Sequence, residues 1–254
     1  MLTTLKNVFK IKELRNKILF TLGMLVVIRF GSQLPVPGIR IDEFVNWFQQ
    51  KVGAADSSGF LSAITGGSFE NMSILALNIT PYITSSIIMQ LLTIAIPKLE
   101  EMQKEGEDGR KKLTALTRYV TVVLALIEST AMAVGFGRQG LLEKFNFVNA
   151  AIVVLTLTAG SAFLMWIGER ITEKGVGNGI SIVLLINILS RIPSDMTSLY
   201  EKFISGKGLA SGGLAAIIII AIILVLVVFT VILQDAERRI PVQYSQKVQG
   251  RKSV

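Results

Sequence analysis

The strongest constraint on this sequence is a stretch near its carboxyl end that carries no charge. Between Gly208 and Gln234 there is no lysine, arginine, aspartate or glutamate, and from Leu214 to Leu233 the only polar side chain is that of Thr230. About 20 consecutive apolar residues in a helix match the hydrocarbon thickness of a bilayer. We therefore expect a membrane-spanning helix here, and we interpret the remaining sequence as spans and loops.

Five further segments have the composition of spans. Residues 145–168 are free of charge, whereas residues 175–190 form a short apolar stretch between Lys174 and Arg191. The other three segments cover residues 18–34, 73–97 and 113–136, and each contains polar side chains. Stretches of this length and apolarity are typical of transmembrane helices. The sequence thus predicts an all-α integral membrane protein with six transmembrane helices.

The lysines and arginines predict the orientation of these spans. Six spans leave both termini on one side, and the four loops on that side (1–17, 98–112, 169–174 and the tail after 234) hold 5, 5, 2 and 5 of these residues. The opposite loops hold seven in total. Because short loops rich in lysine and arginine stay on the cytoplasmic side, we expect both termini in the cytoplasm.

The first span has a basic flank, as a signal peptide does. It is followed by Pro35-Val36-Pro37-Gly38 and not by a cleavage site with small residues. We therefore expect this segment to be a retained anchor.

The chain contains no cysteine and no histidine. Their absence removes disulfides, zinc-thiolate and imidazole metal sites, and the catalytic mechanisms that depend on those side chains. The glycine-rich loop Glu173–Gly179, EKGVGNG, lacks the glycine-lysine-serine/threonine ending of a P-loop and has no strand before it. We expect no catalytic residue, no metal ligand and no cofactor.

Polar residues inside the second and third expected spans need a separate explanation. The second contains Asn78, Pro81, Thr84, Ser85, Ser86 and Gln90. Polar groups in hydrocarbon are costly, so these residues either line protein or a water-filled path, or form a kinked helix whose small residues allow close packing. The third span contains Glu128, and Arg118 precedes it by nearly three helical turns, too far for a direct pair.

Three segments outside the spans also leave alternatives open. Ser57–Met72 is too short and too rich in glycine and serine to span, and it either packs into a cavity or forms an external loop. Residues 98–112 alternate basic and acidic side chains and are predicted to be a solvated loop. The basic tail after Gln234 either anchors on anionic lipid or docks an acidic partner or ribosomal RNA.

Several long strings, in order, closely resemble the SecY family of protein-translocation channels. They cover nearly the whole chain: Phe30-Gly31-Ser32 running into PVPGI, ITGGSFENMSILALNITPYITSSIIMQLL, KEGEDGRKKL followed by Thr117-Arg118-Tyr119, FLMWIGERITEKGVGNGISI, and ERRIPVQYSQKVQGRK. The resemblance implies a ten-helix channel built from two inverted halves, of which this chain supplies the first.

The same resemblance implies a division of the chain into four parts. Residues 1–17 are a cytosolic segment, and 18–190 form the first five-helix half with a short re-entrant plug near 57–72. Residues 191–234 form an external loop and the sixth helix, and 235–254 begin the cytosolic loop that leads to the second half.

The resemblance also assigns roles to residues. The narrow apolar pore ring draws on Ile79, Ile83 and Leu184, and the plug on Phe60, Leu61, Ile64, Gly66, Gly67 and Phe69. The polar residues of the lateral gate are Thr84, Gln90 and Glu128. Docking of a motor or ribosome falls to Arg170, Lys174, Arg238, Arg239, Lys247 and Arg251.

The implied function is a channel that passes unfolded preproteins across the bacterial plasma membrane and releases transmembrane segments sideways into lipid. The channel catalyses no reaction, and its energy comes from a partner. The implied partners are the carboxy-terminal half, SecE-type and SecG-type small subunits, the SecA motor ATPase, the ribosome, signal sequences and membrane lipid.

Two other functions remain as alternatives. A small-solute secondary transporter would also use broken helices and an intramembrane carboxylate such as Glu128. A membrane enzyme is the other, although the sequence offers no nucleophile motif for it.

Overall fold

A computed structural model of the chain describes residues 11–51, 64–203, 205 and 209–237. The chain divides into two compact units, Met1–Pro193 and Ser194–Val254. The described residues form helices joined by turns and by two isolated β-bridges. The predicted all-α fold is therefore confirmed for the part of the chain that the structure describes.

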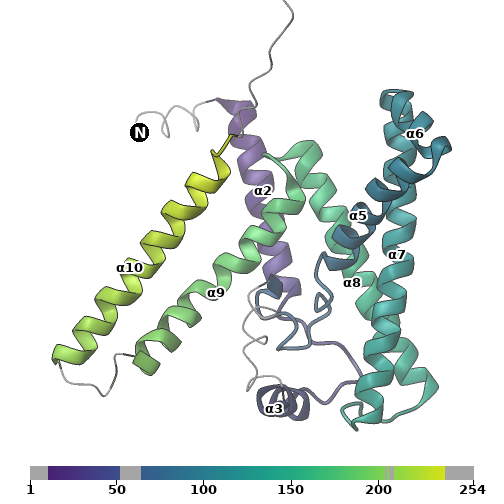
Figure 1. The fold of residues 1–254 in the computed structure, drawn as a ribbon. Helices are drawn as coiled ribbons and strands as arrows, with labels where there is room; N and C mark the ends of the chain where they lie inside the picture. The colour runs from purple at the N-terminus through teal and green to yellow at the C-terminus, as the bar shows by residue number, and fades with distance from the viewer. Residues whose placement is uncertain (1–10, 52–63, 204, 206–208, 238–254) are drawn as a thin grey trace, which may run out of the picture. The chain divides into compact units, whose positions relative to one another are not determined.

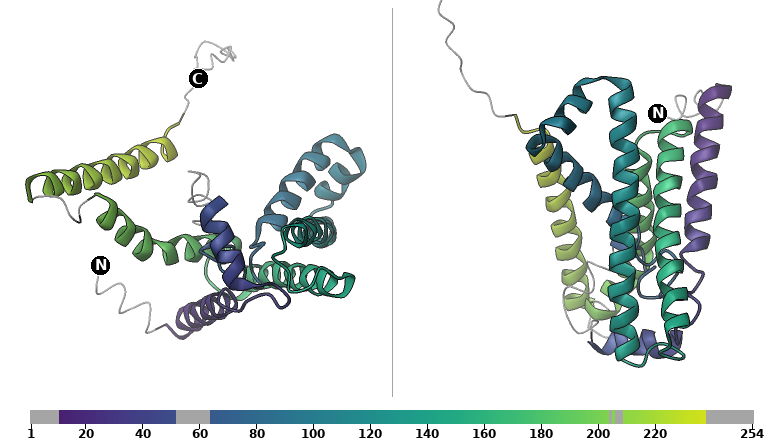
Figure 2. Two further views of the ribbon diagram at one scale, coloured as in Figure 1. Left: turned by 90° about the horizontal axis from the view of Figure 1, so that it is seen from below. Right: turned by 90° about the vertical axis from the view of Figure 1, so that its right-hand side faces the viewer.

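The first unit is a bundle of long helices (Figure 1). The central helix α7 (Glu107–Arg138) packs against α5 (Thr80–Ala95) on one side and α8 (Phe147–Lys174) on the other, and α2 (Lys12–Gly31) packs against α8. Figure 2 shows α7, α8 and α2 running side by side along the length of the unit. The beginning of α9 (Gly179–Phe203) completes the bundle.

A short amphipathic helix, α3 (Ile41–Lys51), lies across one end of the long helices (Figure 1). Its Phe44 and Phe48 are buried, and the Phe44 ring lies edge-on to Phe136 of α7 with 5.2 Å between centroids. Its acidic and amide side chains, Asp42, Glu43, Asn46, Gln49 and Gln50, are exposed. This division of faces places α3 where apolar packing meets water.

The second predicted span begins later than the sequence suggests. Hydropathy predicts it over residues 73–97, but helix α5 begins at Thr80, after a series of turns. Asn78 has a φ of +54°, which a helix does not accommodate, and Pro81 lies in the first helical turn, where its missing N–H costs no hydrogen bond. The expectation failed because hydropathy does not report these backbone angles.

The prediction of a solvated loop at residues 98–112 is wrong. Helix α6 (Pro97–Lys104) follows α5 at a bend of 101°, and α7 begins at Glu107. The alternating charges are spaced for helical ion pairs, such as Lys104 with Glu100 at 2.6 Å. A Cβ at Gly109 would lie 1.7 Å from the Met102 carbonyl oxygen, so α6 and α7 are in close contact at this glycine.

The short span expected over residues 175–190 is also longer in the structure. Helix α9 begins at Gly179 and continues beyond Arg191 and Pro193 to Phe203. Asn178 caps its start, because its Oδ1 accepts hydrogen bonds from the N–H groups of Ile180 and Ser181 at 3.0 and 3.3 Å.

Four helices of the described residues are long and apolar enough to cross a membrane, or five if the bent pair α5 and α6 counts as one span. They are α7, α8, α9 and the part of α10 (Leu209–Gln234) from Gly212 onward. Helix α2 does not qualify, because lysine and arginine occur near both of its ends. The count of six spans therefore stays a prediction.

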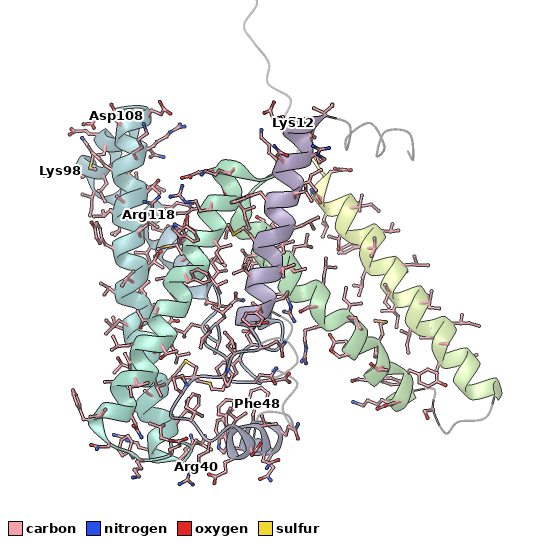
Figure 3. All side chains as sticks on the ribbon, turned by 180° about the vertical axis from the view of Figure 1, so that it is seen from behind. Lys12, Arg40, Phe48, Lys98, Asp108 and Arg118 are labelled. Atoms are coloured by element: carbon pink, nitrogen blue, oxygen red, sulfur yellow. The ribbon has the colours of Figure 1, made fainter. Side chains whose placement is uncertain are left out.

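Different segments lie at the two ends of the first unit. Figure 3 places Lys12, Lys98 and Asp108 at one end, and Arg40 and Phe48 at the opposite end. The beginning of α2 and the α6–α7 turn thus lie at the end that we expect to face the cytoplasm.

The second unit contains the end of α9 and α10. Helix α10 matches the expected span at 208–234 almost residue for residue, and most of its large apolar side chains between Leu214 and Leu233 are exposed. Apolar side chains line a groove of about 480 Å³ between the two helices, including Leu199, Phe203, Ile218 and Ile222. Such a surface is suited to lipid or to another apolar helix.

Candidate functional site

The three predicted ring residues belong to one apolar cluster in the first unit. Ile79 is completely buried where α5 begins, and Ile83 and Leu184 pack at the margin of the same cluster and keep exposed surface. The buried centre comes from α2, α8 and α9, including Ile28, Ile167 and Val183. The structure thus brings Ile83 of α5 and Leu184 of α9 together from distant parts of the chain.

The described part of the predicted plug is folded into the unit. Gly66 and Gly67 are buried with φ angles of +63° and +82°, a backbone conformation that favours glycine. Phe69 packs against Phe48 and Phe44 of α3, with centroids 5.7 and 6.1 Å apart. Ile64 is half-buried. Residues 64–69 therefore do not form an exposed external loop. Phe60 and Leu61 lie outside the described residues.

The predicted gate residues are distributed over two helices. Thr84 of α5 and Glu128 of α7 are half-buried, and Gln90 of α5 is exposed. Two hydroxyl pairs are among the polar contacts between the long helices. Ser85 and Thr121 are 2.6 Å apart between α5 and α7. Ser129 and Thr158 are 2.9 Å apart between α7 and α8.

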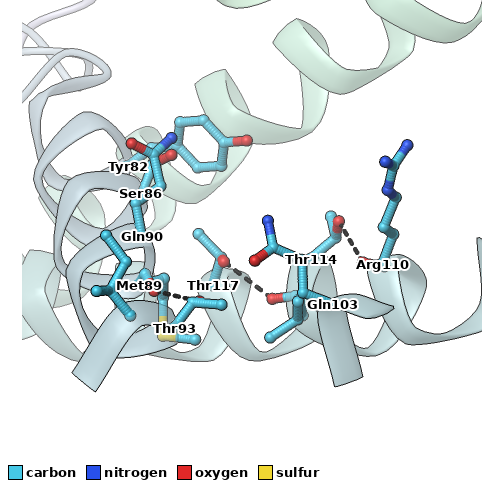
Figure 4. Close-up of a pocket in the computed structure, with 11 residues that line it drawn as sticks. Tyr82, Ser86, Met89, Gln90, Thr93, Gln103, Arg110, Thr114 and Thr117 are labelled. Carbon is cyan, nitrogen blue, oxygen red and sulfur yellow. Dashed lines mark hydrogen bonds between the residues drawn. The ribbon is translucent and has the colours of Figure 1, made fainter. Parts of the chain in front are cut away.

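A polar cavity of about 540 Å³ lies between α5, α6 and α7 (Figure 4). Gln90, Gln103 and Arg110 line it together with Thr93, Thr114 and Thr117. Each threonine donates its hydroxyl hydrogen to a carbonyl of its own helix at 2.6 to 2.9 Å. Their oxygens therefore offer acceptors to the cavity, while the amides and Arg110 offer donors.

A smaller cavity of about 270 Å³ lies next to the first, and Tyr82 and Thr114 line both cavities. On its wall, Arg118 of α7 donates from Nε to Oε1 of Glu169 on α8 at 2.7 Å. The expectation that Arg118 does not pair with Glu128 is thus confirmed. The pair joins α7 to α8, and its carboxylate is the more buried partner, with 17% of its side chain exposed.

The predicted docking residues are placed only in part. Arg170 pairs with Glu173 at 2.7 Å, and its guanidinium lies 5.7 Å from the centre of the Trp166 ring. Lys174 is exposed at the end of α8. The loop that follows is held by α2, because Thr21 Oγ1 accepts from the Val176 N–H at 3.2 Å. Arg238, Arg239, Lys247 and Arg251 lie outside the described residues.

Sequence reasoning missed the residues that join distant elements. Thr121, Ser129 and Thr158 are hydroxyl residues in apolar helices, and this pattern was a usable signal. Asn187 and Arg191 of α9, which contact the segment before α5, gave no signal because their partners are about a hundred residues away.

Within the described residues, the arrangement offers an apolar cluster and polar cavities as binding surfaces. No group of acidic side chains there could hold a metal ion. Apolar side chains and a cavity with mixed donors and acceptors can contact a polypeptide without chemical change.

Comparisons with known proteins agree with this geometry. The model of the SecY family matches residues 73–254. A protein translocase subunit SecY from Halalkalibacterium halodurans is 43% identical over 259 residues, which cover 100% of this chain and 59% of that protein. A second, from Pseudomonas aeruginosa, is 42% identical over 246 residues, which cover 95% of this chain and 54% of that protein.

Among solved structures, Sec61 in the canine ribosome–channel complex from the endoplasmic reticulum matches with a TM-score of 0.52. The identity is 18%, and the match covers 90% of this chain and 49% of that chain. The similarity at this identity concerns the fold. The chain spans a little over half the length of the curated relatives it matches.

Proposed function

This chain belongs to the SecY family, and we propose from this premise that it forms the amino-terminal half of a protein-translocation channel. The channel passes unfolded preproteins across the bacterial plasma membrane and releases apolar segments sideways into lipid. The observation that supports this function most is the family match along the whole chain at 43% identity. It favours a channel over a small-solute transporter or an enzyme.

The site supports the proposal through its chemistry. Branched aliphatic side chains such as Ile83 and Leu184 can close around an extended chain without hydrogen bonds that would retain it. A polar seam between helices can be opened at modest cost. Thr84, Gln90 and Glu128 then form one side of the lateral gate.

The partners follow from the same premise. The canine relative is described as part of a ribosome–channel complex, and we propose that this chain also meets a ribosome or a SecA motor at the end that carries Arg170 and Lys174. The basic residues after Gln234 belong to this docking surface. Signal sequences, membrane lipid, SecE-type and SecG-type subunits and a carboxy-terminal half complete the assembly.

The experiment uses a completed channel, in which this chain is joined to the part of the Halalkalibacterium halodurans protein that it does not cover. A photoreactive amino acid replaces Ile83 or Leu184, and a secretory precursor is stalled during transport. We expect cross-links to the precursor from both positions. Leu155 of α8 serves as the control, because 65% of its surface is exposed and it is predicted to face lipid. Cross-links from Leu155 alone would contradict the proposal.

A further inference from the structure

The segment before α5 lies directly against α9 at Gly66. A Cβ at this glycine would lie 2.9 Å from both the Cα and the carbonyl oxygen of Asn187, so no side chain fits between the two backbones. One residue later, a Cβ at Gly67 would lie 3.3 Å from Nη1 of Arg191. Asn187 and Arg191 are one turn apart and therefore share a face of α9.

A chain of side-chain amides joins the same two elements. Asn187 donates from Nδ2 to Oδ1 of Asn78 at 3.0 Å, and Asn78 donates from Nδ2 to the Ile64 carbonyl at 2.9 Å. Both asparagines are almost fully buried, with 1% and 2% of their surface exposed. Buried amides retain their hydrogen bonds strongly, because an unmade bond leaves a desolvated polar group.

An ion pair joins the same two elements one helical turn further along α9. Arg191 donates from Nη1 to Oε2 of Glu70 at 2.5 Å, and from Nη2 to Oε1 at 3.5 Å. The two side chains are 24% and 31% exposed, so water screens the pair only partly. Arg29 of α2 adds a long contact to the Gly66 carbonyl at 3.5 Å.

We propose that Asn187 and Arg191 form a latch on α9 that holds residues 64–70 in the closed position. The proposal rests on the proposed function, in which this segment closes the pore. Leu184 of the predicted ring precedes Asn187 by three residues on the same helix. A polypeptide that enters the ring and shifts α9 therefore disturbs both latch contacts.

The polar character of the latch suits a part that must open. Apolar packing between α9 and the segment would have to be exposed to water on release, at a cost that grows with area. Amide and charged groups instead replace their hydrogen bonds to each other with hydrogen bonds to water once water reaches them. The hydrogen bonds of the latch are therefore stable while water is excluded, and they break when water and a polypeptide enter.

The test measures release of the segment directly, with Ser68→Cys as the only thiol in the completed channel. Ser68 is 3% exposed in the closed structure, so a membrane-impermeant maleimide added outside reacts slowly. We expect Arg191→Gln and Asn187→Leu each to raise the labelling rate roughly tenfold, the shift that loss of a charge-assisted or buried hydrogen bond gives a two-state equilibrium. The swap of Glu70→Arg with Arg191→Glu should bring the rate back toward that of the parent.

Two controls make the result specific. Glu43→Gln removes an exposed ion pair with Arg40 on α3 and should leave the rate unchanged. Ala133→Cys, at a fully buried position of α7, replaces the Ser68 reporter and should stay unlabelled in each variant that keeps its fold. If Ala133→Cys reacts in a variant, that variant has unfolded. The labelling rate of the charge-swapped variant, Glu70→Arg with Arg191→Glu, then tests the latch in its place.

The outcomes separate the latch from the proposed function. Labelling at the parent's rate in both single variants, or a swap that labels as fast as Arg191→Gln, would overturn the latch. Precursor transport by the completed channel is measured alongside. If the channel transports precursor but the latch variants do not change the labelling rate, the latch alone is refuted. If the variants raise the labelling rate but the channel transports no precursor, the proposed function is refuted and the contact between α9 and the segment remains supported.

Discussion

Arg118 on α7 and Glu169 on α8 form a charged hydrogen bond of 2.7 Å between two membrane-spanning helices. The arginine is 46% exposed and the carboxylate 17%, so the pair lies between a surface ion pair and a buried one. We predict that Arg118→Gln lowers the free energy of unfolding by about 1 kcal/mol, between the values typical of exposed pairs and of charge-assisted hydrogen bonds.

A double-mutant cycle with Glu169→Gln, followed by denaturant unfolding in detergent, isolates the pair itself. The matched control is the pair Arg170 and Glu173, which is exposed on both sides and should couple more weakly. Equal coupling energies for the two pairs would show that Arg118 and Glu169 contribute no more than surface charges do.

Gly160 of α8 gives a second prediction about stability. A Cβ at this position would lie 1.9 Å from the carbonyl oxygen of Ile74, which is backbone and cannot rotate away. Gly160→Ala should therefore destabilise the fold by roughly 1–3 kcal/mol through overpacking. Gly135→Ala on α7 is the control, because nothing lies within 4 Å of its Cβ, and it should be neutral or stabilising. Similar unfolding midpoints for both variants would refute the close contact at Gly160.

The topology predicts the side from which single cysteines react. The chain lacks cysteine, so Lys104→Cys on α6 and Gln246→Cys in the tail should be labelled only by reagent with access to the cytoplasm. Gln49→Cys on α3 and Ser205→Cys should react from outside. Maleimide labelling of intact and opened cells checks all four. External labelling of Lys104→Cys or Gln246→Cys would contradict the six-span orientation.

The apolar ring predicts a change in resting ion leak. Ile83→Gly removes a partly buried aliphatic side chain at the margin of the cluster that contains Ile79 and Leu184. In the completed channel we expect several-fold higher conductance at rest, because the seal depends on apolar contact. Ile94→Gly, on the same helix with an 83% exposed side chain, controls for the helix-weakening effect of glycine. Planar-bilayer recording measures both, and equal conductance would make Ile83 an ordinary packing residue.

Much of the fold was accessible from the sequence because hydropathy reports directly on spans. The charge-free run expected at 208–234 corresponds to α10, and the span expected at 145–168 begins two residues before α8 and ends inside it. The boundaries that failed depend on local backbone chemistry. The positive φ of Asn78 delays α5 to Thr80, and spaced charges turned the expected loop after Pro97 into helix.

The contacts within the site were harder to predict, for a different reason. Glu70 and Arg191 are 121 residues apart, and Asn78 and Asn187 are 109 apart. Each residue taken alone looks like a loop charge or an isolated polar group in a helix. Only the packing of the segment before α5 on α9 gives them partners, and no local pattern encodes that packing. The hydroxyl pair Ser85 and Thr121 is similar, since its residues become neighbours only when α5 and α7 pack together.

We propose that this chain is one half of a protein-translocation channel, and transport into vesicles tests this proposal most directly. This chain alone and the completed channel are each reconstituted with the SecA motor, ATP and a secretory precursor, and the protease-protected precursor is measured. We predict protected precursor with the completed channel and none above background with this chain alone, because half a ring cannot seal or enclose a polypeptide. Robust transport by this chain alone, or none by a correctly assembled completed channel, would contradict the account.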